Sequence, residues 1–250
     1  MAIPLSHNLF PGASMFIGDA SRPGMQFILA QPWMAGLDEG LRQRIVDSVY
    51  TLQGNKGEVI LKANEEVQGW YAVLTGLVKL QSQLSQGRRQ GYLGIPGGEW
   101  FGEGSVMKNE PRRYDVIALR DSELLCLPRP LFEELYATSI LFNQSISRHL
   151  NMRLGQVMVI IETMRLRAPD QRVAMYLGPT LWHGSRRMSL SQEELGILSG
   201  LSRQTVNTVL NEFGRQGLVS LDFGRIEIKD EKGLMAIAFN ANHLREAPRG

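Results

Sequence analysis

The sequence contains few residues of the kinds that build disulfide frameworks and metal sites. Its 250 residues include one cysteine, Cys126. A single thiol excludes an intrachain disulfide framework and a zinc or iron–sulfur site made of four cysteines from one chain. The histidines show no pair with ligand spacing, so we expect neither haem nor another metal; they are His7, His149, His183 and His243.

Long hydrophobic runs and a large excess of one charge are also absent. No apolar stretch approaches the ~18–20 residues of a transmembrane helix, and residues 1–10 lack the basic and apolar regions of a signal peptide. Lys and Arg together number 27 against 25 for Asp and Glu, so charge alone does not indicate a nucleic-acid partner. These absences predict a cytoplasmic protein that contacts no membrane.

The motifs of common enzyme classes are missing as well. The chain has no Gly-x-Ser-x-Gly elbow, no His-Glu-x-x-His pair and no Walker loop. We therefore expect no catalytic residues and interpret the chain as a protein other than an enzyme.

Glycine gathers in one part of the chain, where short β-prone runs alternate with turns. Between Gly54 and Gly104 lie 11 of the 26 glycines. Short strands at regular intervals indicate an antiparallel barrel or sandwich. The runs are 58–61, 70–74, 77–81, 92–95, 115–119 and 122–127. A helix is expected before them at 37–50, and the first ~30 residues are expected to form a loosely attached extension.

The period becomes helical after about Pro130. Hydrophobic residues then recur at alternating steps of four and three, as in the a/d seam of a coiled coil. The seam residues are Leu150, Leu154, Val157, Ile161 and Met164. Two interpretations stay open: the helix packs on its own β domain, or it pairs with a second copy. It should end before Pro169, and Asp170 can cap the next helix.

The most informative segment lies in the last quarter of the chain, where two short helices meet at a glycine turn. Ser191 with Glu194 three residues later is a capping box that begins the first helix. Gly196 costs stability inside a helix unless another backbone approaches it closely. Gly200 ends this helix, and Ser202 caps the next one. Together these signals predict a helix-turn-helix unit.

The second helix of this unit has an apolar face and a polar face. Polar side chains at a helix N-terminus suit base edges and phosphates in the major groove of DNA. A hairpin expected from runs at 218–221 and 226–229 would add a wing. The residues expected to contact DNA are Ser202, Arg203, Gln204, Thr205, Asn207 and Thr208 of the helix and Arg225 of the wing. The alternative is a helical hairpin whose polar face is only solvated.

The order of these parts resembles the cyclic AMP receptor protein and FNR family of bacterial transcription regulators. The strongest motifs are the helix-turn-helix and the stretch from Trp100-Phe101-Gly102-Glu103 to Arg112-Arg113-Tyr114-Asp115. The resemblance covers about residues 37–238 and implies an α+β fold. Its expected parts are an extension (1–34), an antiparallel jelly-roll β-barrel like those that bind cyclic nucleotides (35–136), a dimerisation helix and hinge (137–168) and a winged helix-turn-helix domain (169–250).

The resemblance also implies an effector pocket. In relatives that bind cyclic nucleotides, a Gly-Glu pair supplies the acid that holds the ribose, and an arginine ten residues later, followed by Ser or Thr, holds the phosphate. Gly102 and Glu103 match and Arg113 has this spacing, but the bulky Tyr114 replaces the small hydroxyl residue. A cyclic nucleotide stays open, but we expect an effector other than cyclic AMP, or none. The pocket should include Gly102, Glu103, Gly104, Ser105, Arg112, Arg113 and Tyr114.

The function that the resemblance implies is sequence-specific regulation of transcription by a homodimer. Its partners would be a palindromic operator in double-stranded DNA, a second copy of the chain and, for an activator, RNA polymerase. Relatives often carry Arg-Glu and a later Arg where this chain has Arg203, Gln204 and Thr208, so its operator is expected to differ. The alternative is a cyclic-nucleotide-responsive module whose C-terminal domain binds a protein; burial of the side chains at 203 and 204 would favour it.

Overall fold

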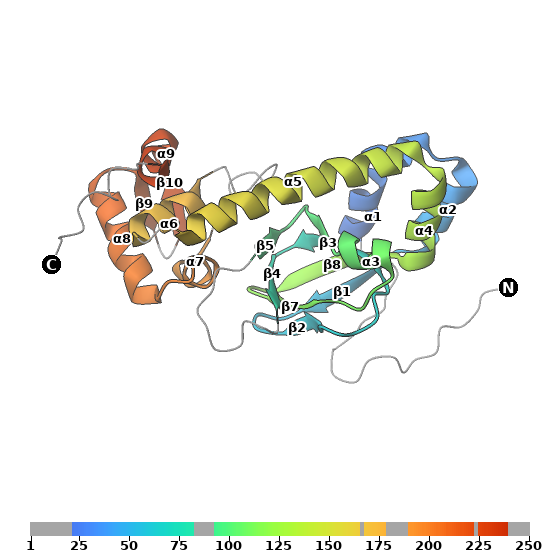
Figure 1. The fold of residues 1–250 in the computed structure, drawn as a ribbon, viewed down its shortest axis with the longest axis horizontal. Coiled ribbons are helices and arrows are strands. Elements are labelled where there is room, and N and C mark those ends of the chain that lie inside the picture. Colours follow the sequence, from blue (N-terminus) through green and yellow to red (C-terminus); the bar gives the residue numbers. More distant parts are fainter. Residues whose placement is uncertain (1–21, 83–92, 166–167, 179–189, 223–224, 240–250) are drawn as a thin grey trace. The chain divides into compact units, whose positions relative to one another are not determined.

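A computed structural model describes residues 22–82, 93–165, 168–178, 190–222 and 225–239 (Figure 1). The chain divides into two units. The first unit comprises the described residues before Lys79 and those of Ile95–Ile146. The second unit comprises the other described residues, most of which follow Ile146. No helix in the described ranges is long and apolar enough to cross a membrane.

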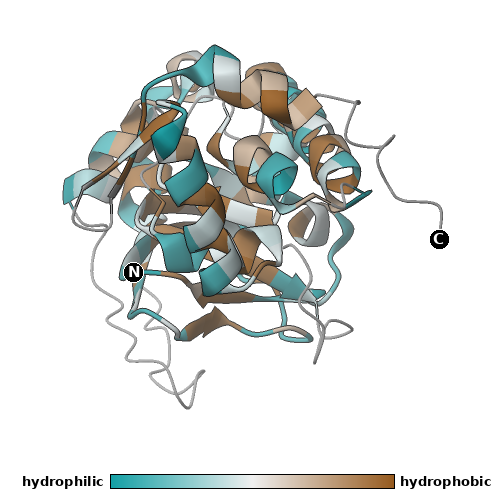
Figure 2. Ribbon diagram, turned by 90° about the vertical axis from the view of Figure 1, so that its left-hand side faces the viewer, coloured by the Kyte–Doolittle hydropathy of each residue, from teal (hydrophilic) through white to brown (hydrophobic). Residues whose placement is uncertain are grey.

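Within the described ranges, eight strands form two four-stranded sheets, with the orders β1-β8-β3-β6 and β2-β7-β4-β5. The strands are β1 (Tyr50–Gly54), β2 (Val59–Leu61), β3 (Gly69–Thr75), β4 (Leu77–Ser82), β5 (Leu93–Pro96), β6 (Trp100–Phe101), β7 (Tyr114–Ala118) and β8 (Ser122–Pro128). All six expected strands are present, with ends within one residue of the prediction. The expected barrel is not closed, since the described strands pair in two separate sheets. Hydrophobic residues, brown in Figure 2, are frequent in the strands.

The segment before the sheets packs more firmly than the sequence suggested. It forms α1 (Arg22–Leu29), the 3-10 helix η1 (Pro32–Gly36) and α2 (Glu39–Ser48). Ile28 is fully buried and Trp33 is 1% exposed. The Trp100 indole N–H donates to the Gln31 side chain at 3.0 Å. The expected loose extension is therefore wrong for residues 22–34; residues 1–21 lie outside the described ranges. The helix expected at 37–50 is α2, which ends before β1.

Aromatic rings join the helices of the first unit to its sheets. Trp70 of β3 stacks on Trp100 of β6 with ring centroids 4.1 Å apart. Phe142 meets Trp33 edge-on at 5.1 Å and Phe132 at 5.3 Å. Phe132 and Phe142 come from α4 (Arg129–Thr138) and α5 (Ile140–Arg165). The helical stretch after Pro130 is thus two helices rather than one.

The second unit contains the predicted helix-turn-helix and wing. Its elements are α6 (Pro169–Leu177), α7 (Gln192–Ser199), α8 (Arg203–Arg215), β9 (Val219–Asp222), β10 (Arg225–Ile228) and α9 (Glu231–Phe239). β9 and β10 pair antiparallel, as expected for the wing. The sequence analysis did not anticipate α9, which packs against α6 and buries Leu234 and Ala238.

Replacing Phe142 with alanine should destabilise the first unit strongly. Phe142 is fully buried among three aromatic rings. Phe142→Ala should lower the free energy of unfolding by about 3–5 kcal/mol. The control Leu29→Ala truncates a side chain that is 49% exposed and should cost less than about 1 kcal/mol. Denaturant titration followed by tryptophan fluorescence measures both, and equal losses would contradict the proposed role of this cluster.

Candidate nucleic-acid interface and effector site

Gly196 brings the two helices of the helix-turn-helix into close backbone contact. A Cβ added at Gly196 would lie 3.1 Å from the carbonyl oxygen of Leu201 and 3.8 Å from the backbone nitrogen of Arg203. The Leu201 N–H donates to the Gly196 carbonyl at 2.9 Å. Gly200 ends α7 with a φ of 70°, a conformation that glycine adopts without strain. The structure confirms the prediction that Gly196 is small because the backbone that leads into the second helix approaches it closely.

Side-chain caps fix where both helices begin. Ser191 and Glu194 form the expected capping box: the Glu194 carboxylate accepts from the Ser191 N–H at 2.7 Å, and the Ser191 hydroxyl accepts from the Glu194 N–H at 3.2 Å. The Ser202 hydroxyl accepts from the Thr205 N–H at 3.1 Å and lies 2.7 Å from the Thr205 hydroxyl. The start of α8 is therefore held by residues predicted to approach DNA.

The first turns of α8 present exposed polar side chains. Arg203, Gln204, Asn207 and Thr208 are all exposed, whereas Thr205, hydrogen-bonded to the cap, is half-buried. The apolar face of the helix lies in the interior; its buried residues are Val206, Leu210 and Phe213. This arrangement disfavours the alternative that required buried side chains at 203 and 204. The side chain of Arg225, at the start of β10, lies outside the described side chains.

The effector-site motif begins at the left-handed turn of Gly102. Gly102 has a φ of 90° and precedes the short helix α3 (Glu103–Lys108). Glu103 is half-buried at the start of this helix, Gly104 is exposed and Ser105 is 8% exposed. The Gly-Glu pair thus lies at the start of a short helix.

Two adjacent arginines have opposite environments. The Arg112 side chain is 2% exposed, whereas that of Arg113 is 72% exposed and pairs with Glu110 at 2.8 Å. Glu110 also pairs with Lys108 at 3.2 Å, and hydrogen bonds from both bases lower the pKa of its carboxyl group. The residue spacing selected Arg113 as the phosphate-holding arginine, but the buried side chain beside Gly102 is Arg112.

Arg112 is a buried cation with unused hydrogen-bond donors. Its Nε and Nη1 have no hydrogen-bond partner among the described residues. Its guanidinium carbon lies 5.0 Å from the ring centroid of Tyr71, a cation–π contact that contributes about 2 kcal/mol in a desolvated setting. Removing an ion from water costs several kcal/mol, so this contact alone does not offset the burial. The site is therefore suited to an anion.

Tyr71 and Cys126 are parts of this site that the sequence analysis missed. Tyr71 of β3 pairs in register with Cys126 of β8, which also pairs with Tyr50 of β1. Burial raises the pKa of the Cys126 thiol to about 12, and this effect exceeds that of the hydrogen bonds with Tyr50 and Tyr71, which lower the pKa. Burial likewise raises the pKa of Tyr71. The register of the paired strands brings these residues together, and a single sequence does not specify that register.

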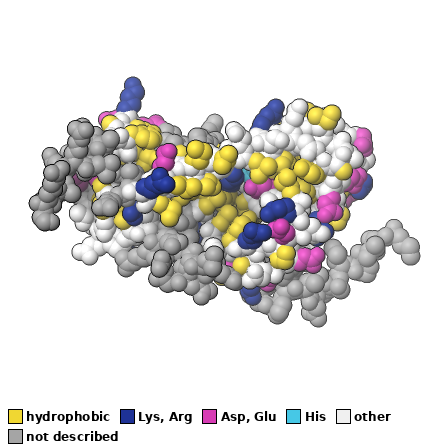
Figure 3. Space-filling model, in the orientation of Figure 1, with side chains coloured by type: hydrophobic (Ala, Val, Ile, Leu, Met, Phe, Trp, Pro, Cys, Tyr) yellow, Lys and Arg dark blue, Asp and Glu magenta, His cyan; other side chains and the backbone are white. Residues whose placement is uncertain are grey.

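The predicted seam of α5 is exposed in the single chain. Leu150 is 38% exposed, Leu154 60%, Val157 39%, Ile161 49% and Met164 48%. Other positions of the helix, such as Gln156 and Thr163, are buried. Hydrophobic side chains, yellow in Figure 3, gather along the helix. The seam is thus not covered by the described part of its own chain.

The described residues contain no cluster of three or more His, Cys, Asp or Glu side chains able to hold a metal.

The buried thiol gives a direct test of the strand register. Because the pKa of Cys126 is about 12 and its side chain is fully buried, the native protein should not react with Ellman's reagent at pH 8. Unfolding in guanidinium should release one reactive thiol per chain. A Thr75→Cys variant, altered at an exposed position, should show one fast-reacting thiol in the native state. Fast labelling of the unaltered native protein would contradict this placement.

Two family models match the chain, one in each part. The cyclic nucleotide-binding domain matches residues 52–139, and the Crp-like helix-turn-helix domain matches residues 171–237. The cyclic AMP receptor protein of Thermus thermophilus is 29% identical over 185 residues, covering 74% of this chain and 86% of that protein. The transcriptional regulator SdrP of the same species is 30% identical over 175 residues, covering 67% and 83%.

Solved structures show the same fold. A CRP/FNR-family transcriptional regulator from Thermus thermophilus is 27% identical with a TM-score of 0.51, covering 75% of this chain and 97% of that one. FixK2 from Bradyrhizobium japonicum is 23% identical with a TM-score of 0.60, covering 76% and 96%. The matched regulators are not enzymes, as expected for this chain. The chain belongs to the CRP/FNR family of DNA-binding transcription regulators, with a cyclic nucleotide-binding domain and a Crp-like helix-turn-helix.

Proposed function

We propose that this chain binds a two-fold symmetric operator as a homodimer, placing one α8 helix in the major groove of each half-site. The observation that carries the proposal is the exposed polar start of α8. Base contacts in this class of motif come from the N-terminal residues of the second helix. On this basis Arg203, Gln204, Asn207 and Thr208 read the bases. Ser202, Thr205 and Arg225 contact the DNA backbone.

The residue types at these positions suggest the bases that they read. An arginine fork pairs with guanine, and a glutamine amide pairs best with adenine. Arg203 and Gln204 lie side by side in the first turn of α8 and are both exposed. Thr208, one turn later, supplies a hydroxyl, which hydrogen-bonds less selectively than an arginine. The operator should therefore require fewer guanines than a site read by two arginines.

The second copy of the chain is the occupant that best fits the seam of α5. Five exposed hydrophobic side chains at alternating spacings of four and three match the knobs of a two-stranded coiled coil. A continuous apolar strip of this kind is unfavourable in water and favours association. The face of the helix that carries Gln156 and Thr163 is not available to a second copy, since both residues are buried. Pairing through the seam would give the symmetry that a palindromic operator requires.

We assign effector sensing to residues 35–136, pairing to 137–168 and DNA binding to 169–250. An effector acts by stabilising the dimer arrangement in which both recognition helices fit half-sites one DNA turn apart. Its ligand is an anion other than cyclic AMP, for which Arg112 supplies the charge. RNA polymerase is a further partner if the protein activates transcription. Because its operator is chromosomal DNA, the protein acts in the bacterial cytoplasm.

Replacing Arg203 should weaken operator binding far more than replacing Arg215. Arg203→Ala removes a base-reading fork and should lower affinity about tenfold to a hundredfold. Arg215→Ala changes the other end of the same helix, where the side chain is 74% exposed and pairs with Glu212 at 3.0 Å; affinity should stay within about threefold. Gel-shift titration at fixed salt, with a duplex selected by the unaltered protein, measures both. Unchanged affinity of Arg203→Ala would contradict the assignment.

Charges placed in the seam should separate the subunits. Leu154→Asp combined with Ile161→Asp puts two carboxylates per chain into the apolar strip, and sedimentation should then report monomers. The control Arg148→Asp introduces an acid at an exposed position of α5 away from the seam and should leave a dimer. A double variant that still sediments as a dimer would show that the subunits meet elsewhere.

A further inference from the structure

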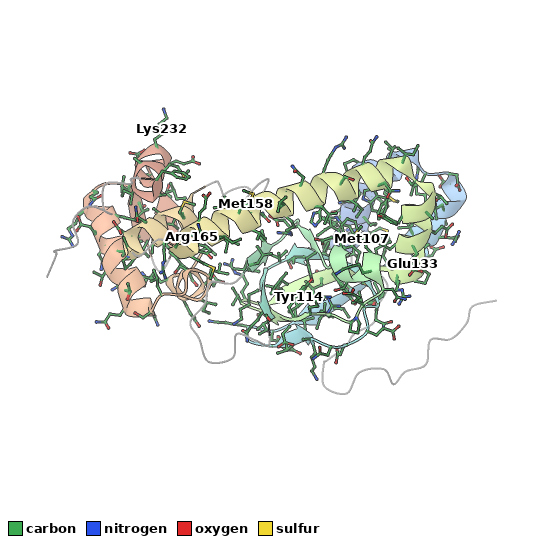
Figure 4. All side chains as sticks on the ribbon, in the orientation of Figure 1. Met107, Tyr114, Glu133, Met158, Arg165 and Lys232 are labelled. Carbon is green, nitrogen blue, oxygen red and sulfur yellow. The ribbon has the colours of Figure 1, made fainter. Side chains whose placement is uncertain are left out.

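Two hollows border α8 on the side of the helix that faces the start of α6. The larger hollow has a volume of about 480 Å³ and the smaller one about 440 Å³. The larger hollow is lined by Pro169, Asp170, Gln204, Thr205, Thr208 and Val209. Asp170, Thr208 and Val209 also line the smaller hollow. Figure 4 shows the side chains of α8 as sticks on the pale orange helix. Asp170 is therefore the acid that borders both hollows from the first turn of α6.

The carboxylate of Asp170 has no partner in the part of the chain that the structure describes. Asp170 is the second residue of α6 and is half-buried. The sequence analysis expected it to cap this helix, but the N-cap is Ala168, which makes no side-chain hydrogen bond. Neither a hydrogen bond nor an ion pair joins Asp170 to another described residue. An ionised carboxylate accepts hydrogen bonds and donates none, so Asp170 can accept from an incoming donor.

Asp170 lies next to two of the residues proposed to read bases. Gln204 and Thr208 are four residues apart, so they lie on the same side of α8, and both are exposed. Both also line the larger hollow together with Asp170. Arg203 and Asn207, the other exposed polar residues at the start of α8, line neither of the two hollows. A base pair in contact with Gln204 and Thr208 would therefore have Asp170 beside it.

A carboxylate at a DNA surface is unfavourable unless a base supplies a donor to it. The phosphates of the duplex repel a negative charge, and this repulsion acts on every sequence. The donors that bases present in the major groove are the N4 amine of cytosine and the N6 amine of adenine. Adenine presents the N7 acceptor beside its amine, whereas cytosine presents the amine alone. An acid side chain at this position therefore favours cytosine over the other bases.

We propose that Asp170 determines part of the operator sequence: its carboxylate accepts a hydrogen bond from the N4 amine of a cytosine next to the base pair read by Gln204. The inference rests on the proposed function, because it requires α8 to lie in the major groove. It adds to the reading surface an acid from α6, outside the helix-turn-helix. Since each subunit of the homodimer carries one Asp170, the cytosine recurs once in each half-site.

The sequence preference is tested by selection from a random duplex library with the full-length unaltered protein and with Asp170→Asn. The unaltered protein should select a symmetric operator with a required cytosine in each half-site. Asparagine is similar in size, carries no charge and pairs best with adenine, so Asp170→Asn should lose the preference for cytosine at that position alone and favour adenine. A purely structural role of Asp170 would lower affinity without changing the preference at one position. A consensus that Asp170→Asn leaves unchanged would overturn the proposal.

Gel-shift titrations at fixed salt separate base reading from general repulsion. They compare the operator selected by the unaltered protein with a duplex of scrambled sequence. Asp170→Asn should bind the selected operator at least about fivefold more weakly, because the hydrogen bond between carboxylate and cytosine is lost. It should bind the scrambled duplex about threefold more tightly, because each dimer loses two charges that the phosphates repel. Equal gains on the two duplexes would mean that Asp170 only repels DNA, which contradicts a role in base reading.

Glu231 provides the matched control. It is an acid in the first turn of α9, is exposed and lines neither of the two hollows. Glu231→Gln should leave the selected consensus unchanged and both affinities within about twofold. A loss of the cytosine preference in Glu231→Gln would show that the effect does not depend on the position of Asp170, and the assignment would be wrong.

Failure of this inference is distinguishable from failure of the proposed function. If the unaltered protein selects a symmetric operator that requires Arg203, but Asp170→Asn keeps the cytosine, only the role of Asp170 is overturned. If the unaltered protein selects no symmetric operator, the proposed function fails and the role of Asp170 fails with it.

Discussion

The close backbone contact between Gly196 and Leu201 is the constraint on which DNA recognition depends. A side chain at 196 would have to fit within 3.1 Å of the Leu201 carbonyl, so the approach of α7 to the start of α8 requires a residue without one. The Leu201 N–H bonds back to Gly196, and Ser202 then caps α8. This short chain of contacts decides which residues of α8 are exposed.

A second constraint operates in the β domain, where Arg112 is buried and its neighbour Arg113 is exposed. The burial of Arg112 against Tyr71 leaves donors and charge that a ligand can satisfy. The family resemblance describes the type of site, and Tyr114 stands where relatives that bind cyclic nucleotides are expected to carry Ser or Thr.

Local signals in the sequence predicted the elements whose chemistry is local. The capping box of Ser191 and Glu194, the glycine turn and the hydrophobic period of α8 gave the helix-turn-helix, and glycine-bounded runs gave six strands. Contacts between distant segments were not predictable in this way. The packing of Trp33 on Phe142 and the pairing of Tyr71 with Cys126 depend on register and on helix placement. Spacing alone chose Arg113 over Arg112, because residue counting does not show which of two adjacent side chains is buried.

The central claim is that two copies present a matched pair of α8 helices to one duplex. The most direct test is selection of sequences from a random duplex library by the unaltered protein. The account predicts a two-fold symmetric consensus with half-site centres one helical turn apart, about 10–10.5 base pairs. It also predicts two chains per duplex in the complex. A consensus with a single asymmetric half-site, bound by one chain, would contradict it.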